Sequence, residues 1–521
     1  MQAGTWVHRP HRRGRWQRGA ASGFRGGRGG RWFTFWLVGA AWLLAGCTVG
    51  PDYHPPRPAM PDRWQTAGEN GAEVGPLPLA HWWTLFEDER LGDLVARALD
   101  ANPDLKIAAA RVREARALWR AAGAEEWPSL DAIGAYTRLR RSENVPSSAV
   151  RNQDLYQAGF DAGWEIDLFG GVRRSVESAA ARAAAAEENR RDVMVTLSAE
   201  VAVNYLTLRG SQRRLEIARE NIQIQRETVD LTEGRLAAGL GSRLAVVQAR
   251  SLLASTEARV PALEAAIRQA VYRLDVLMGR EPGALLDDLL VPGAHLPPPP
   301  AVPVGLPSDL LRRRPDIRSA ERELAAATAD IGVATAELFP HFSLGALFGL
   351  QSAAAADLLS ASSRFWSVGP TLRWPVFDAG RVRALIRVAT ARQETALALY
   401  EKTILTALEE VESAMVGAAK GREADAALAR AVDTIGQSAD IALALYQKGL
   451  VDFLNVLQSE QALYQVQDQF VQHRQDLAVT YVGLFKALGG GWEPDADAPG
   501  SSPPAVGASD VASPTPWAAA E

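Results

Sequence analysis

The chain has 521 residues, more than one ordinary domain needs, and its single Cys excludes internal disulfides and Cys-based zinc sites. Hydrophobic residues make up 47% and charged residues 22%, so the chain can bury a large core. The formal net charge is −5, but residues 1–46 hold eight Arg and no acidic residue, which leaves 48 basic against 61 acidic residues in the remainder. This negative body argues against nucleic acid as the main partner.

The first 46 residues have the pattern of an export signal. An Arg- and Gly-rich stretch precedes the apolar run 32–45, which is short for a membrane-spanning helix. A positive segment, a brief hydrophobic segment and small residues before a cleavage point predict a signal peptide over 1–46. An RGG-like nucleic-acid arm and a stop-transfer anchor are the alternatives. The sequence LAGC, which ends at Cys47, resembles a bacterial lipobox, and this implies cleavage before Cys47 and its acylation. A buried free thiol is the alternative for Cys47.

Motifs recur in the same order along the chain. The sequence NPDL at 102–105 returns as RPDI at 314–317, and Gly239-Leu240 returns as Gly449-Leu450, at offsets of 212 and 210 residues. Ordered recurrence at nearly one offset indicates an internal duplication. We therefore predict an N-terminal lipidated segment (47–100), a first repeat (101–290), a Pro-rich linker (291–307), a second repeat (308–492) and a disordered tail (493–521).

Four segments alternate between apolar and polar residues, and they lie at 129–139, 155–167, 342–351 and 365–376. A period of two gives each strand one apolar and one polar face. About 9–11 residues are enough for a tilted strand to cross a bilayer, so we predict membrane strands, with a soluble sandwich as the alternative. Trp164, Trp366 and Trp374 lie near strand ends, and we expect them to anchor at the membrane–water interface rather than in a core.

Very long helices follow the strands. Residues 395–447 carry a heptad series that only Asp425 breaks, and the counterpart over about 171–237 carries two apolar series on nearly opposite sides. A helix with two seams packs between two neighbours. The returning helices continue the heptads, and Pro261 should kink or loosen the first of them. These helices are too polar to face lipid, so we expect them to project into water.

Four strands leave two edges unpaired, and lipid offers no partner for exposed backbone groups. Because the smallest membrane barrels have about eight strands, one chain cannot close a barrel and several copies must do so together. The predicted fold class is mostly α with a membrane β-barrel portion. Each chain has a two-fold internal repeat of four strands and very long coiled-coil helices.

Three motifs carry a resemblance to a known family: CTVGPDYHPP at 47–56, WWTLFEDERL at 82–91 and ALGGGW at 487–492. They resemble the TolC-like outer membrane factors of the NodT/OprM branch. The resemblance implies a homotrimer with a 12-stranded barrel and a 12-helix periplasmic tunnel, held in the outer membrane and anchored by lipid on Cys47. It also implies a passive exit duct for drugs or other small toxic compounds, coupled through a periplasmic adaptor to an inner-membrane RND pump.

Three alternatives to drug efflux stay open at this stage. Heavy-metal efflux and type I protein secretion use ducts of the same fold, and a structural coiled-coil lipoprotein without a pore belongs to a different class. The sequence does not encode the cargo, because the pump selects it.

Gly239 and Gly449 fall where each long helix meets its returning partner, and a left-handed backbone at a helix end is the usual reason for such a Gly. The resemblance implies that these turns form the periplasmic tip, where the adaptor docks. Arg235, Leu240 and Leu450 are then candidate contacts, together with the two glycines.

The family often narrows this tip with acidic residues spaced as Gly, five residues, Asp, two residues, Asp. Here the matching positions after Gly449 are Asn455 and Gln458, neither of which is charged, while Asp452 lies nearby. We therefore expect hydrogen bonding by Asn455 and Gln458, rather than an acidic ring, to hold the aperture closed.

The seven His residues show no metal-like spacing, and no Walker loop, nucleophile elbow or HExxH motif is present in the sequence. We predict no catalytic residue, no metal site, no cofactor and no enzymatic activity.

Overall fold

The computed structural model describes residues 48–65, 79–140, 142, 144, 152–291, 296 and 307–492. They belong to one compact unit that begins at Thr48. The leader, the predicted lipidation site Cys47, most of the Pro-rich linker and the C-terminal tail lie outside the described residues.

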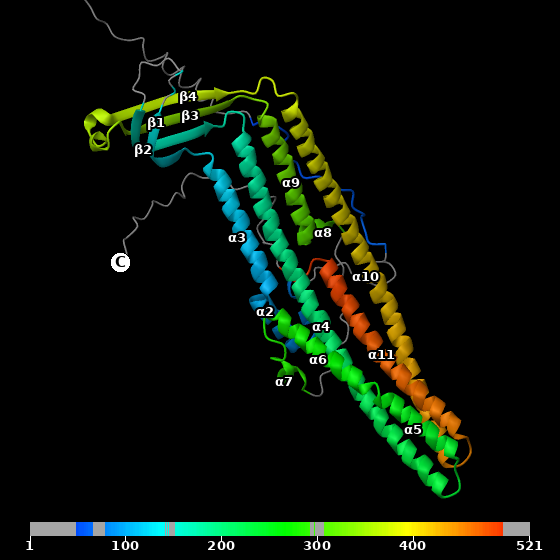
Figure 1. Cartoon of the computed structure of the whole chain (residues 1–521). Coiled ribbons are helices and arrows are strands. Elements are labelled where there is room, and N and C mark those ends of the chain that lie inside the picture. The colour runs from blue at the N-terminus through cyan, green and yellow to red at the C-terminus, as the bar shows by residue number, and fades with distance from the viewer. Residues whose placement is uncertain are drawn as a thin grey trace, which may run out of the picture. The chain divides into compact units, whose positions relative to one another are not determined.

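The four predicted strands form one antiparallel sheet in the order β1-β2-β3-β4 (Figure 1). The last strand is shorter than predicted, because it ends at Arg373 instead of residue 376. Pro375 has no N–H to donate and therefore cannot continue the ladder. The strands span Ser129–Arg140 (β1), Asn152–Ile166 (β2), His341–Ser352 (β3) and Arg364–Arg373 (β4).

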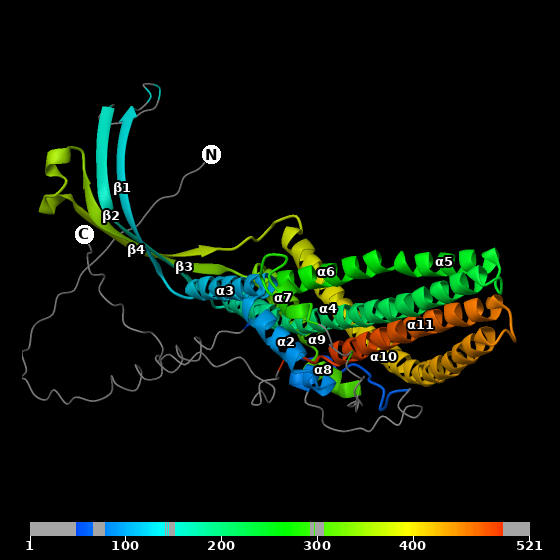
Figure 2. The same cartoon turned by 90° about the horizontal axis from the view of Figure 1, so that it is seen from below.

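The strand register places most of the large apolar side chains on one face of the sheet. Phe160 of β2 pairs with Phe348 of β3, which pairs with Trp366 of β4, and all three side chains are at least half exposed. The opposite face carries mainly polar residues and glycines, including the directly paired Gly159 and Gly349, together with Leu347 and Phe365. Figure 2 shows how strongly the strands twist relative to one another.

The helices on either side of the strands have equal lengths in the two repeats. A 67-residue helix, α4 (Gly171–Ala237), follows β2, and another 67-residue helix, α10 (Arg381–Gln447), follows β4. The 22-residue helices α3 (Pro103–Ala124) and α9 (Pro315–Ala336) precede β1 and β3. This correspondence confirms the predicted duplication and the predicted extent of the first long helix.

The returning helices differ between the repeats. In the first repeat the chain returns as α5 (Arg243–Glu257) and α6 (Val260–Leu277), whereas the second repeat returns as the unbroken α11 (Phe453–Ala487). The break lies just before Pro261, as predicted, because Pro removes a helical hydrogen bond and fits the first turn of a new helix.

Short elements complete the described part of the chain. They are η2 (Leu79–Phe86), α2 (Glu89–Ala101), α7 (Leu286–Leu289), η3 (Pro307–Asp309), α8 (Leu310–Arg313), η4 (Ala355–Asp357) and η5 (Ala361–Ser363). Among the described residues, no helix has both the length and the apolar character that a membrane crossing requires.

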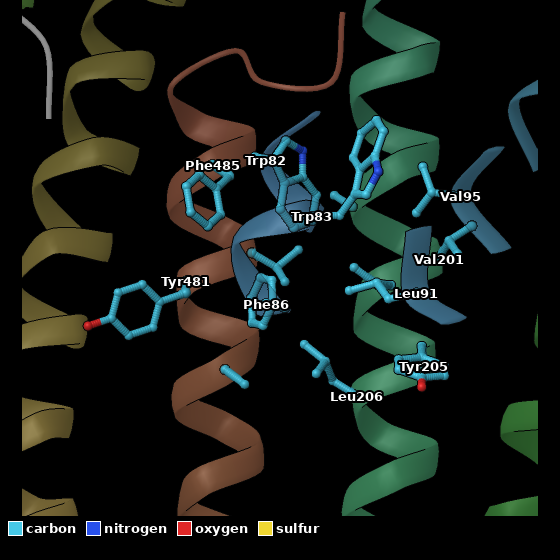
Figure 3. Packing of buried hydrophobic residues seen from close by; sticks show 14 of the residues in the cluster. Trp82, Trp83, Phe86, Leu91, Val95, Val201, Tyr205, Leu206, Tyr481 and Phe485 are labelled. Atoms are coloured by element: carbon cyan, nitrogen blue, oxygen red, sulfur yellow. The ribbon is translucent and has the colours of Figure 1, made fainter. Parts of the chain in front are cut away.

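The main hydrophobic core lies where α2, α4 and α11 meet around the aromatic residues of η2 (Figure 3). Trp82 is fully buried, and its ring stacks on Phe485 of α11 with the centroids 5.1 Å apart. Phe86 packs edge-on against both rings. The tryptophan-rich motif WWTLF therefore ties the N-terminal part of the chain to the last helix.

Both apolar series on α4 are largely covered within a single chain, and each has one exposed member. Val201, Leu208 and Val229 of the first series and Ile217 of the second have little exposed surface. Leu236 of the first series and Ile224 of the second are 38% and 42% exposed, so each series has a position that one chain does not cover. On α10, the heptad break at Asp425 is filled by an ion pair, since Arg474 of α11 donates to Asp425 over 3.0 Å.

Candidate functional site

The two turns between the long helices and their returning partners have the same backbone geometry. Gly239 and Gly449 both have φ of +74°, which confirms the left-handed conformation predicted for them. In the first turn Gly239 N donates to Leu236 O and Leu240 N donates to Arg235 O, at 3.0 and 2.8 Å. These two bonds define a Schellman motif, and the turn at Gly449 repeats them.

Apolar side chains project from both turns into solvent. Leu240 is 70% exposed and Leu450, its counterpart in the second repeat, is 68% exposed. Below them, Tyr446 and Phe453 pack edge-on with ring centroids 5.5 Å apart, within a small core at this end of the helices. The tip is therefore a supported surface that exposes one leucine from each turn.

Arg235 connects the two turns, a contact that the sequence did not reveal. Its Nη1 donates to the carbonyl of Gln447, the last residue of α10, over 3.1 Å, and its guanidinium lies 4.8 Å from the ring centroid of Tyr446. A cation at the C-terminal end of a helix is favoured by the helix dipole. Arg235 therefore caps the helix of the other repeat.

The three predicted aperture residues lie together at the start of α11. Asp452 is the N-cap residue but makes no capping hydrogen bond with its side chain. Asn455 Nδ2 donates to the Asp452 carbonyl over 3.2 Å, and Gln458 lies one turn further along α11. All three are exposed. Within one chain, the Asn455 side chain therefore donates to a carbonyl of its own turn and not to a neighbouring helix.

A row of polar contacts, which we call the polar seam, joins α4 to the second hairpin (α10 and α11). Its α4 members recur every seven residues, so they share one helix face. The hydrogen bonds are Arg214 Nε to Asp468 Oδ1 (2.7 Å), Asn221 Nδ2 to Gln467 Oε1 (2.9 Å), Thr228 Oγ1 to Glu460 Oε1 (2.6 Å) and Arg235 Nη1 to Gln447 O. The two hairpins are therefore joined by hydrogen bonds along a line that runs down to the turns.

At the sheet, two of the three predicted interface tryptophans make the same contact in each repeat. Trp164 Nε1 donates to Glu126 O and Trp374 Nε1 donates to Leu338 O, both over 3.0 Å. Each bond joins the base of a strand to the end of the preceding helix. Trp366 lies within β4 and is 74% exposed. Placement of these rings at a lipid interface stays a prediction.

The first described residues are bound to the start of α4. Arg174, only 4% exposed, donates from Nη2 to Asp52 Oδ1 over 2.6 Å and from Nε to Val49 O over 3.3 Å. Gly50 lies directly against Gly332 of α9, where a Cβ would collide with backbone. Residues 48–52 are thus fixed to the junction between the sheet and the long helices.

The comparisons with known proteins follow this architecture closely. A family model described as outer membrane efflux protein matches residues 94–280 and 306–490, one segment for each repeat. The chain belongs to this family. It is 34% identical to the solvent efflux pump outer membrane protein SrpC of Pseudomonas putida, over 86% of this chain and 96% of SrpC. It is 36% identical to the pyoverdine export outer membrane protein OpmQ of Pseudomonas aeruginosa, over 88% and 97%.

Solved structures of outer-membrane channels share the fold of this family member. The structure of the outer-membrane channel OprN matches with a TM-score of 0.81 and 39% identity, covering 86% of this chain and all of that chain. A structure of CusC matches with a TM-score of 0.74 and 30% identity, covering 85% and 100%. The chain thus spans nearly the full length of the proteins that it matches.

Proposed function

We propose that this chain is the outer-membrane exit channel of a tripartite RND-type efflux pump. It acts as a passive duct for drugs or other small toxic compounds. The family supports an efflux role, and relatives named for solvent efflux, pyoverdine export and cation efflux point to export of small molecules and ions.

The observation that carries the proposal is the open sheet. β1 and β4 are its edges, and one face carries the exposed row of Phe160, Phe348 and Trp366. An apolar sheet with two free edges is stable in lipid only when other strands complete it. Three chains supply twelve strands, enough for a closed barrel, whereas a single chain falls below the smallest barrels, which have about eight.

Exposed apolar residues on the helices support the same homotrimer. Ile107 and Leu118 of α3 are 50% and 61% exposed, and Leu399 and Leu405 of α10 are 54% and 67% exposed. Because these side chains are already partly buried, covering them against a sister chain contributes about 1–2 kcal/mol each, less than the value for complete burial. Side-by-side packing would continue the helical layer around a periplasmic tunnel.

The periplasmic adaptor docks, in this proposal, on the exposed leucines of the two Schellman turns. Leu240 and Leu450 supply the apolar contact, and Gly239 and Gly449 keep the turns narrow. Asp452, Asn455 and Gln458 line the aperture beside them. Acylation of Cys47 anchors the chain to outer-membrane lipid, next to the residues that Arg174 holds.

Purification from outer-membrane fractions tests the proposal directly. We expect an SDS-resistant trimer with heat-modifiable migration that conducts ions in planar bilayers. Deletion of the gene should raise intracellular accumulation of a fluorescent efflux substrate, and the Leu240→Asp/Leu450→Asp variant should insert as a trimer but fail to restore efflux. A stable monomer that conducts no current would refute the proposal.

Heavy-metal efflux is the second candidate cargo class. Cation efflux system protein CusC of Escherichia coli is 32% identical over 97% of its length, a similarity close to that of the solvent and pyoverdine proteins. Type I secretion uses the same kind of duct. A coiled-coil lipoprotein without a pore is disfavoured, because such a scaffold has no use for the exposed apolar sheet. Accumulation assays with a dye and a heavy-metal salt, together with a secretion assay for a protein, would separate these cargos.

A further inference from the structure

One member of the polar seam differs from the others because no cation accompanies its charge. Glu460 is 6% exposed, and it accepts a hydrogen bond from Thr228, which is 3% exposed. Its second oxygen, Oε2, has no hydrogen-bond partner among the described residues. By contrast, the acidic group at the top of the seam, Asp468, is paired with Arg214.

The amide of Gln225 lies on the same face of α4, three residues before Thr228. The side chain is 2% exposed, and neither Oε1 nor Nε2 has a hydrogen-bond partner in the described part of the chain. Residues three apart are neighbours on a helix surface. The seam therefore holds a carboxyl group and an amide, both buried and incompletely satisfied, on facing helices.

The charged groups that the structure describes on the surrounding helices are paired with other residues or face solvent. Arg226 of α4 pairs with Glu257 of α5, and Arg250 of α5 pairs with Glu233 of α4. The guanidinium of Arg259 lies over the ring of Tyr464. On α10, the acids nearest this level, Asp433 and Asp440, are exposed. Within the part of the chain that the structure describes, the pKa of Glu460 responds to its burial first and to the Thr228 hydrogen bond second.

An uncompensated buried carboxylate is costly, so the neutral acid is the favoured form in a closed seam. Burial raises the pKa of Glu460 above its ordinary range, although the hydrogen bond from Thr228 opposes the rise. A protonated Glu460 also gains a donor on the oxygen that lacks a partner. The side-chain carbonyl of Gln225 is an unoccupied acceptor on α4, about one turn from Thr228.

We propose that Glu460 is a proton-binding site that controls the contact between the two hairpins of one chain. Protonated Glu460 keeps α4 and α11 together, and loss of the proton loosens the seam near the turns. Proton binding by Glu460 does not depend on the proposed efflux function. Only the further step, in which a loosened seam widens the aperture beside the turns, rests on that function.

The sign of the pH dependence follows from the raised pKa. The stabilisation of the closed seam is fully present below the ordinary pKa of a Glu carboxyl and is lost as the pH rises through the pKa in the closed seam. Between these two values the equilibrium constant for opening rises about tenfold per pH unit, and above them it levels off.

Hydrogen exchange of α11 amides in the full-length protein, followed by mass spectrometry, measures the opening. Wild type and Glu460→Gln are compared at each pH, so that the intrinsic pH dependence of exchange cancels. We expect the two proteins to match at low pH and the wild type to exchange faster as the pH rises. Glu227→Gln, which removes an exposed carboxyl group one residue from Thr228, should behave as the wild type.

The Thr228→Val variant distinguishes proton binding from a merely structural role. It removes the hydroxyl that stabilises the ionised carboxyl group, so the midpoint of the pH profile should move to higher pH. Infrared spectra should show a protonated carboxyl band in the wild type that Glu460→Gln lacks. A pH-independent difference between wild type and Glu460→Gln, or an unmoved midpoint in Thr228→Val, would overturn the proposal. Those outcomes would not bear on the proposed function, which is tested separately by trimer formation and by conductance in planar bilayers.

Discussion

Arg314 is the second-repeat counterpart of Asn102, and both side chains donate a hydrogen bond to an equivalent carbonyl. Asn102 Nδ2 reaches Leu277 O over 2.7 Å at the end of α6, and Arg314 Nη1 reaches Ala487 O over 3.0 Å at the end of α11. Both donors occupy the N-cap position of the following helix. Each repeat thus joins the end of its returning helix to the start of the helix that leads to the sheet.

Asn102→Ala should destabilise the protein by about 2–3 kcal/mol. It removes the side-chain oxygen that caps α3, worth about 1 kcal/mol, and leaves the buried Leu277 carbonyl without its donor. Asn102→Ser is the matched control, because a Ser hydroxyl keeps the cap on α3 but is too short to reach the Leu277 carbonyl, so its loss should be smaller. Temperature-dependent dissociation of the SDS-resistant trimer measures the effect, and equal losses in the two variants would contradict the account.

Gly239→Ala should cost about 1–2 kcal/mol, through backbone strain alone. The residue has φ of +74°, which L-residues avoid, but a Cβ there meets no atom within 4 Å. Gly239→Asn should cost less, since Asn tolerates the left-handed region better. Thermal denaturation ranks the three proteins, and an Asn variant less stable than the Ala variant would show that contacts, rather than φ, determine the residue.

Gly159→Ala should prevent the sheet from forming. A Cβ there would lie 2.5 Å from the Phe348 carbonyl and 2.8 Å from the Cα of Gly349, so the backbone of β3 would have to move. Gly369→Ala is the control within the same sheet, because its Cβ meets nothing within 4 Å. We expect loss of the outer-membrane trimer for the first variant and normal amounts for the second, measured on outer-membrane fractions. Equal yields would contradict the close approach of these strands.

Arg235→Met should loosen the contact between the two turns by about 1–2 kcal/mol. The change keeps an unbranched aliphatic chain like the stem of Arg. It removes both the hydrogen bond to the Gln447 carbonyl and the cation above the Tyr446 ring. Higher single-channel conductance in planar bilayers is the expected result. Arg235→Lys should be intermediate, because it keeps the charge without the planar guanidinium. Unchanged conductance in both variants would show that the Arg235 contact does not control the width of the aperture.

The elements with a regular period could be predicted from the sequence. Alternation located the four strands, and the heptads and Gly239 located the end of the first long helix to within a residue. The predicted end of β4 was three residues too late. The alternation of apolar and polar residues continues through Trp374, although Pro375 cannot continue the hydrogen-bonded ladder. The proposed roles of the aperture residues, the interface tryptophans and Cys47 stay predictions.

The cross-repeat contacts could not be read from the sequence. The polar seam recurs every seven residues, but a search for apolar periodicity passes over its α4 members, because all of them (Arg214, Asn221, Thr228 and Arg235) are polar. Similarly, Asp425 interrupts a heptad in the sequence, and only the packing of α10 against α11 reveals Arg474 as its partner. The 212-residue offset aligned Asn102 with Arg314, but not the carbonyls that they bind.

The break between α5 and α6 makes the two hairpins mechanically unequal. The return limb of the first has a joint at residues 258–259, whereas that of the second is a single rod of 35 residues. A sideways force on the first turn can bend the chain at residues 258–259, so α6 moves little. The same force on the second turn displaces α11 as one helix. This displacement would reach the aromatic core, where Phe485 of α11 stacks on Trp82.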